Sequence, residues 1–145
     1  MPLRLDVGAF PLEEDGDHYT RDAHERFCAA LAAELHSFQR PLIVADSTID
    51  HHNWSYDGEW TGWASATLRE ALGKRAIVDA VCGSGFVARA TSNEHFYTRL
   101  SHHLRTANVD AVVFVGGWND VRAGRTNDAC ASARACVALA QRYVG

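Results

Sequence analysis

Three short apolar runs alternate with segments of helical periodicity, and this alternation limits the possible folds more than any other feature. The runs cover residues 42–45 (Leu-Ile-Val-Ala), 76–81 and 110–115. Each run is too short for a typical helix and is mostly apolar, which is characteristic of a strand buried on both faces. Helices that connect parallel strands cover such a sheet from both sides. The pattern therefore predicts an α/β protein with a short parallel sheet.

The helical segments take their predicted boundaries from apolar spacing and from capping residues. The first runs from Thr20 to about Phe38, and the second from about Trp60 to Leu72, where Gly73 supplies a stop. A capping box is expected at Thr91–Glu94, followed by a helix with a buried stripe. A last helix over residues 127–143 is expected to face inward with Ala133, Val137 and Ala140. Residues 3–7 are predicted to add a strand beside residues 110–115.

Length and composition favour one domain over residues 1–145 and exclude several classes of partner. The net charge of −4 and the scattered arginines offer no basic surface for nucleic acid. No apolar run reaches the length of a membrane span, and no secretory signal pattern is visible, so a cytoplasmic protein is expected. The four cysteines lack Cys-x-x-Cys spacing, and three of them (Cys28, Cys130 and Cys136) fall in helical patterns typical of buried thiols.

Residues of catalytic type follow each predicted strand. Ser47 comes after the first strand, a glycine loop around Gly83 after the second, and Asn119 after the third. The carboxyl ends of parallel strands meet at one edge of a sheet, where ligands bind. A serine nucleophile also needs a base, and the segment Asp15-Gly16-Asp17-His18 offers His18 as that base and Asp15 to orient it.

These blocks together resemble the SGNH, or GDSL-like, esterase and lipase family. Ala45-Asp46-Ser47 resembles the family's Gly-Asp-Ser block, with alanine in place of the glycine. Residues 77–86 resemble its glycine block, and Gly117-Trp118-Asn119-Asp120 its Gly-x-Asn-Asp block. The Asp-x-x-His block, which family members carry near the C-terminus, corresponds here to Asp15–His18. The order of the blocks indicates a circular permutation.

The resemblance implies a three-layer α/β/α (flavodoxin-like) fold and a serine hydrolase that needs neither cofactor nor metal. Ser47 would be the nucleophile, His18 the base and Asp15 the orienting residue. The backbone N–H groups of Ser47 and Gly83 and the side-chain amide of Asn119 would form the oxyanion hole. The implied substrate is a small-molecule or carbohydrate ester with a short acyl group, for instance an acetyl group on a sugar.

Other interpretations of the same residues remain open. Each block taken alone is ordinary turn chemistry. Trp54, Tyr56 and Trp118 are candidates to line a substrate site, and aromatic walls suit a sugar ring as well as an acyl chain. The chain could therefore be a non-catalytic glycan-binding domain that keeps the fold. It could also be one subunit of an assembly that completes its site, because an exposed sheet edge would allow a homo-oligomer.

The paired histidines are weaker candidates for the site. His51-His52 follows Ser47 closely, so this pair could line the site or compete with His18 for the role of base. His102-His103 falls within a predicted helix, where sequence neighbours point in different directions, and is expected at the surface. No pair has the spacing of a zinc site, and no metal is expected.

Overall fold

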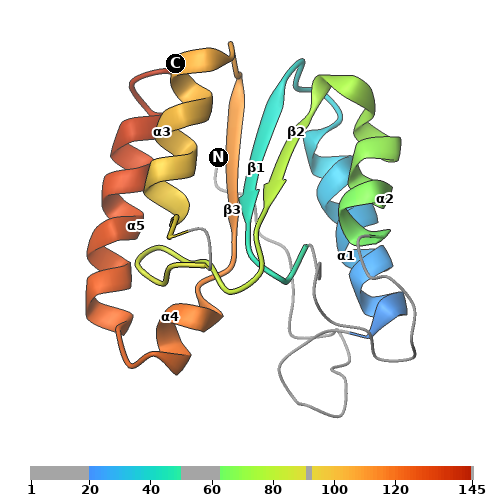
Figure 1. Cartoon of the computed structure of the whole chain (residues 1–145). Coiled ribbons are helices and arrows are strands. Elements are labelled where there is room, and N and C mark those ends of the chain that lie inside the picture. Colours follow the sequence, from blue (N-terminus) through green and yellow to red (C-terminus); the bar gives the residue numbers. More distant parts are fainter. Residues whose placement is uncertain (1–19, 50–62, 91–92, 145) are drawn as a thin grey trace.

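The computed structural model describes residues 20–49, 63–90 and 93–144, and these form a mixed α/β structure (Figure 1). Its elements in chain order are α1 (Arg21–Leu35), β1 (Pro41–Ala45), α2 (Trp63–Leu72), the 3₁₀ turn η2 (Gly73–Arg75), β2 (Ile77–Ala80), α3 (Phe96–Thr106), β3 (Ala111–Val115), α4 (Trp118–Arg122) and α5 (Thr126–Ala140). Asp15, His18, Trp54 and Tyr56, and the predicted strand over residues 3–7, lie outside the described residues.

The described strands form one parallel sheet in the order β2-β1-β3. Val44 in β1 is level with Asp79 in β2 and with Phe114 in β3. Every residue of the central strand β1 is buried, as expected for a parallel strand covered on both faces. The prediction of a parallel α/β sheet from the three apolar runs is thus confirmed for the described part of the chain.

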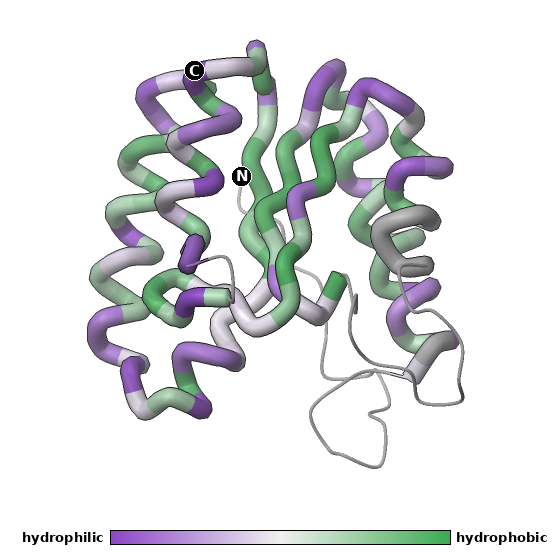
Figure 2. The backbone as a smooth tube through the Cα atoms, in the orientation of Figure 1, coloured by the Kyte–Doolittle hydropathy of each residue, from purple (hydrophilic) through white to green (hydrophobic). Residues whose placement is uncertain are grey.

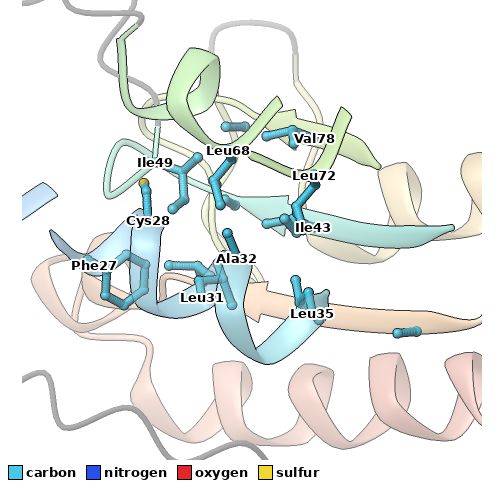
Figure 3. Packing of buried hydrophobic residues seen from close by; sticks show 14 residues of the cluster. Phe27, Cys28, Leu31, Ala32, Leu35, Ile43, Ile49, Leu68, Leu72 and Val78 are labelled. Atoms are coloured by element: carbon cyan, nitrogen blue, oxygen red, sulfur yellow. The ribbon is translucent and has the colours of Figure 1, made fainter. Parts of the chain in front are cut away.

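Helices pack on both faces of this sheet (Figure 1). On one face, α1 and α2 bury a cluster that includes Leu31, Leu68 and the β1 side chain Ile43 (Figure 3). On the other face, α3 and α5 cover the alternate side chains of the same strand, Leu42 and Val44. The strands are accordingly the most continuously apolar part of the backbone, whereas polar residues alternate along the helices (Figure 2). Burial of these two clusters is the main favourable contribution to folding.

The first helix is shorter than the sequence predicts, and the second ends at Leu72 as predicted, while its predicted start at Trp60 lies outside the described residues. Thr20, the predicted first residue, is the N-cap of α1, and its Oγ1 accepts a hydrogen bond from the Ala23 N–H at 3.3 Å. The helix ends at Leu35, and Phe38 packs against the core from the connection that follows. In the described part of the chain α2 begins at Trp63, and Gly73 with φ +69° follows its end, as a left-handed glycine stop should.

Two further predictions differ from the structure: the capping box of α3 and the inward-facing residues of α5. The capping box of α3 consists of His95 and Thr98, not of Thr91 and Glu94. His95 Nδ1 accepts from the Thr98 N–H, and Thr98 Oγ1 accepts from the His95 N–H. In α5, Val137 is 46% exposed, and the buried positions are Ala129, Cys136 and Ala140. Ala140 is thus buried as predicted and Ala133 is half-buried, whereas the prediction that Val137 faces inward is wrong.

Within the described residues, no helix has the length and apolar character that a membrane crossing requires.

Candidate functional site

The carboxyl ends of the strands lie at one edge of the sheet, at the bottom of Figure 1. Two backbone hydrogen bonds extend the pairing beyond the strands themselves. The Asp46 N–H donates to the Val115 carbonyl at 3.1 Å, and the Val81 N–H donates to the Ala45 carbonyl at 3.0 Å. The segments that follow the strands therefore begin side by side. The sheet thus fixes where the segments of Ser47, Gly83 and Asn119 start.

Asp46 shapes the turn that carries Ser47. Its carboxylate is buried, and Oδ1 accepts a hydrogen bond from the Thr48 N–H at 2.8 Å. The Asp46 carbonyl also accepts from the Ile49 N–H at 3.2 Å, which closes a tight turn around Ser47. Ile49 is fully buried in the α1–α2 core. Ser47, itself mostly buried, is thus held between the end of β1 and a core residue.

Asn119 joins the turn of Ser47 to the glycine loop. Its Nδ2 donates to the Ser84 carbonyl at 2.8 Å and to Asp46 Oδ2 at 3.3 Å. Asn119 lies in the first turn of α4, a short helix that the sequence analysis did not predict. The structure therefore brings two of the predicted oxyanion residues, Ser47 and Asn119, onto segments that touch through Asp46.

Glycine is required where β3 turns toward this site. Gly116 has φ +146°, and a Cβ there would lie 2.5 Å from Asp46 Oδ2 and 2.8 Å from Phe96 Cζ. Both the backbone conformation and the lack of space exclude other residues. Gly117 follows with φ +113° and precedes α4. These two glycines let the Asn119 segment approach Asp46 closely.

Gly83 lies in the loop after β2, next to the residue that Asn119 contacts. Its φ of +77° is left-handed, and no atom of the described residues lies within 4 Å of where a Cβ would be. Glycine is thus favoured here by the backbone conformation and not by crowding. The neighbouring Ser84 N–H donates to the Val81 carbonyl at 3.2 Å and closes the turn.

The glycine loop continues around a buried carboxylate that sequence analysis did not single out. Asp120 is fully buried and accepts hydrogen bonds from the N–H groups of Phe86 (2.8 Å), Val87 (3.0 Å) and Ala88 (2.6 Å). A Cβ on Gly85 would overlap Asp120 Oδ2. Asp120 therefore fixes the far side of the loop, directly after the predicted oxyanion residue Asn119.

Arg99 is a second buried charged residue that sequence analysis missed. It lies on α3 with 4% of its surface exposed, and its guanidinium group reaches the end of β1, β2 and the glycine loop. One signal was available in the sequence. Arg99 is three residues after Phe96 and one before Leu100, so it falls on the apolar stripe that the helix buries.

Beside Arg99, a pocket of about 370 Å³ opens at the β2 edge of the sheet, lined by Val78, Asp79, Glu94, Arg99, His102 and His103. His103 Nε2 lies 2.7 Å from Asp79 Oδ2 and is only 20% exposed, whereas His102 is exposed. The prediction that both histidines lie at the surface is thus right for His102 and wrong for His103. His103 can contact Asp79 because the β2 register places this carboxylate level with Val44, on the face of the sheet that α3 covers.

The remaining predicted site residues divide into two groups. Asp15, His18, Trp54 and Tyr56 lie outside the described residues, as do His51 and His52. Trp118 is described: it precedes Asn119 and is 50% exposed at the edge of the sheet where the strands end. Of the predicted set, the structure thus gathers Ser47, Gly83, Asn119 and Trp118 on three neighbouring segments.

Among the described residues, three titratable groups have clearly shifted pKa values. Burial, followed by the neighbouring charge of Arg89, lowers the pKa of His95; a backbone hydrogen bond opposes this shift, Arg99 adds to it, and Asp120 opposes it. Burial, with a smaller contribution from Glu25, raises the pKa of Cys28 to about 12. Burial raises that of Cys136 to about 11. All four cysteines are free, and Cys130 is exposed, contrary to the expectation of a buried thiol.

Among the described residues, no group of three or more His, Cys, Asp or Glu side chains is arranged to hold a metal ion.

No protein-family model matches the chain, and neither a curated protein nor a solved structure matches it significantly. The interpretation of the site therefore depends on its own residues.

Proposed function

We propose that this protein is a serine hydrolase that cleaves carboxylic esters through an acyl-enzyme on Ser47. His18 acts as the general base and Asp15 orients it. The observation that carries the proposal is the pair of hydrogen bonds from Asn119 to Ser84 and Asp46, because they join the segment of the nucleophile to the glycine loop. A nucleophile and its oxyanion donors must lie together in this way for acyl transfer.

The proposed reaction proceeds in two balanced halves. Ser47 Oγ attacks the ester carbonyl carbon while its proton passes to His18, which gives a tetrahedral oxyanion. The oxyanion collapses, the bond to the alcohol oxygen breaks, and His18 returns the proton to the leaving alcohol. Water then attacks the acyl-enzyme with His18 again as base, which releases the carboxylic acid and restores Ser47. Asp15 holds the imidazole tautomer and stabilises its protonated form.

The proposed oxyanion hole consists of the N–H groups of Ser47 and Gly83 and the Nδ2 of Asn119. The 3.3 Å contact from Asn119 to Asp46 is the longer of its two hydrogen bonds and therefore the weaker one. We expect this N–H to turn toward the oxyanion while the bond to the Ser84 carbonyl keeps the amide in place. Gly83 offers an approach free of a side chain.

The proposed fold is the three-layer α/β/α arrangement of SGNH hydrolases, permuted so that the Asp-x-x-His block precedes the nucleophile. The parallel order β2-β1-β3, with helices packed on both faces, is compatible with it. We propose a small-molecule or carbohydrate ester with a short acyl group as substrate. The half-exposed Trp118 beside Asn119 supports a ring or acyl contact at this edge.

The proposal is tested by hydrolysis of 4-nitrophenyl acetate. Wild type should turn over, Ser47→Ala and His18→Ala should abolish turnover, and Asn119→Ala should lower kcat roughly 100- to 1000-fold, as loss of one oxyanion donor does. Matched controls are Ser37→Ala, His36→Ala and Asn108→Ala, because these three residues are exposed on other segments. Turnover that survives both Ser47→Ala and His18→Ala would show that the site is elsewhere.

A second candidate function is supported by one observation. An exposed tryptophan beside polar loops also suits a domain that binds a glycan without cleaving it, and Trp118 has that exposure. In that case calorimetry would detect saturable sugar binding that Trp118→Ala removes and Ser47→Ala leaves unchanged, together with no ester turnover.

A further inference from the structure

Arg99 is a charged side chain that is almost fully buried, and burial of a charge is costly unless its partners are arranged around it. Its partners come from three separate segments. The guanidinium group donates to Asp79 on β2, to the carbonyl of Ala45 at the end of β1, and to the Ser84 hydroxyl in the glycine loop. Arg99 is therefore a connection between the strand ends as well as a part of the core.

Asp79 fixes the orientation of the guanidinium group. Arg99 Nη1 donates to both Asp79 Oδ1 and the Asp79 backbone carbonyl at 2.8 Å. The other carboxylate oxygen of Asp79 lies 2.7 Å from His103 Nε2. The carboxylate is thus held from two sides, and it compensates the positive charge of Arg99. This leaves the second nitrogen, Nη2, directed at the strand ends.

Nη2 makes the two contacts that concern the proposed site. It donates to the Ala45 carbonyl at 3.0 Å, two residues before Ser47, and to Ser84 Oγ at 2.8 Å, one residue after Gly83. Ser84 Oγ in turn donates to the Val81 carbonyl at 2.6 Å, where the glycine loop begins. A single nitrogen atom therefore spans the segment of the nucleophile and the segment of an oxyanion donor.

We propose that Arg99 is a positioning residue that sets the spacing between Ser47 and the Gly83 N–H; this assignment rests on the esterase function proposed above. Arg99 reaches the reaction only through Ala45 and Ser84. A displacement of about 1 Å in a reacting geometry can cost roughly 100-fold in rate. Arginine suits this role because its planar fork directs several N–H groups at once, whereas a lysine ammonium cannot span the same acceptors.

The first test separates positioning from general stability by steady-state kinetics. Arg99→Ala should lower kcat for 4-nitrophenyl acetate roughly 10- to 100-fold with KM within about twofold, because transition-state contacts are lost and ground-state binding is kept. Arg99→Lys should recover only part of this loss. Arg105→Ala is the matched control, since Arg105 is exposed on the same helix, and it should behave as wild type.

Chemical rescue supplies a readout that a merely structural role would not move. The pocket beside Arg99 gives small cations a route to the space that Arg99→Ala leaves. Guanidinium chloride, far below unfolding concentrations, should restore a part of kcat to Arg99→Ala and none to Asn119→Ala. Urea at the same concentration has a similar shape without charge and should restore nothing.

Ser84→Ala tests the same connection without removing a buried charge. It should lower kcat less than Arg99→Ala does, and the double variant should lose less than the product of the two single losses, because both changes break one connection. Should Arg99→Ala fail to fold, an unchanged kcat in Ser84→Ala would overturn the proposal.

The remaining outcomes keep the two proposals apart. An active wild type with unchanged kcat in a folded Arg99→Ala would overturn the role of Arg99 and leave the esterase proposal standing. So would full independence of the Arg99→Ala and Ser84→Ala losses. A wild type without turnover would overturn the esterase proposal, and the positioning role with it.

Discussion

The Asp120 carboxylate is fully buried and is held by three backbone N–H groups of the glycine loop. Asp120→Asn would place an amide NH₂ against N–H donors that now meet a carboxylate oxygen. Hydrogen bonds to charged groups are worth more than neutral ones, so the substitution should cost about 2–3 kcal/mol of unfolding free energy. Urea unfolding followed by far-UV circular dichroism measures this loss.

Asp128→Asn is the control for this prediction. Asp128 pairs with Arg125 at the surface, and exposed pairs of this kind contribute less than about 1 kcal/mol. Equal unfolding free energies for wild type and Asp120→Asn would mean that a neutral amide serves the loop as well as the carboxylate, and that the loop does not depend on the charge.

Single residues also show what the sequence can predict. The common location of Ser47, Gly83 and Asn119 was predictable because each follows an apolar run, and parallel strands bring such positions to one edge. Arg99 was missed although its place on the buried stripe of α3 was a signal, and the buried role of Asp120 was missed because it is recognisable only from its partners. The partners of Asp120 are backbone N–H groups 32 to 34 residues away, and no sequence pattern marks them.

At the scale of elements, the start of α3 depends on a titratable cap. His95 Nδ1 accepts a hydrogen bond from the Thr98 N–H, and it can do so only while Nδ1 carries no proton. Burial, Arg89 and Arg99 lower the pKa of His95. Below the ordinary histidine pKa of about 6.5, the unfolded chain therefore binds more protons at this position than the folded one. The contribution of the His95 cap to the free energy of unfolding is therefore complete above that pH and is lost as the pH falls.

His95→Asn should remove this pH dependence, because asparagine caps a helix without titrating in this range. The unfolding free energy of wild type should fall more between pH 7.5 and pH 5 than that of the variant, measured by urea unfolding at both values. His102→Asn on the same helix serves as the control. The same pH dependence in His95→Asn and in wild type would show that the cap does not titrate with folding.

Element boundaries mark a second limit of sequence analysis. The apolar period located α1, α3 and α5, but the capping box of α3 was assigned four residues too early. Thr91 and Glu94 match the usual Ser/Thr-x-x-Glu sequence of a capping box. His95 and Thr98 form the same pair of hydrogen bonds, but a histidine at the N-cap does not match that sequence. The short helix α4 was missed because five residues show no period.

At the scale of the whole molecule, the sheet formed by the described residues ends in two strands, β2 and β3, whose surroundings differ chemically. At β2, arginine side chains from both helical layers already donate to strand carbonyls: Arg69 Nη2 to Val78 at 3.0 Å and Arg99 Nη1 to Asp79 at 2.8 Å. Cationic side chains at an edge discourage pairing with another chain. A homo-oligomer that forms through the sheet is therefore expected to use the β3 side, where residues 3–7 are also predicted to pair.

A homo-oligomer also raises the question of whether the proposed site is complete within one chain or is shared between two copies. If His18 serves Ser47 of its own chain, Ser47→Ala and His18→Ala inactivate separate molecules, and co-refolding the two variants cannot restore turnover. If His18 reaches Ser47 of a second copy, mixed dimers contain one intact pair and regain a part of the wild-type rate.

We expect no restoration, because Asp15 and His18 come directly before α1 in the sequence, and the core side of α1 shares a buried cluster with Ile49, two residues after Ser47. The measurement is 4-nitrophenyl acetate hydrolysis by the co-refolded mixture, with a wild-type and Ser47→Ala mixture as the positive control. Light scattering on the same samples gives the mass of the species present. Turnover in the first mixture, with a dimer mass, would replace the single-chain site by one shared between two copies, and the β3 edge would then be the first place to look for their contact.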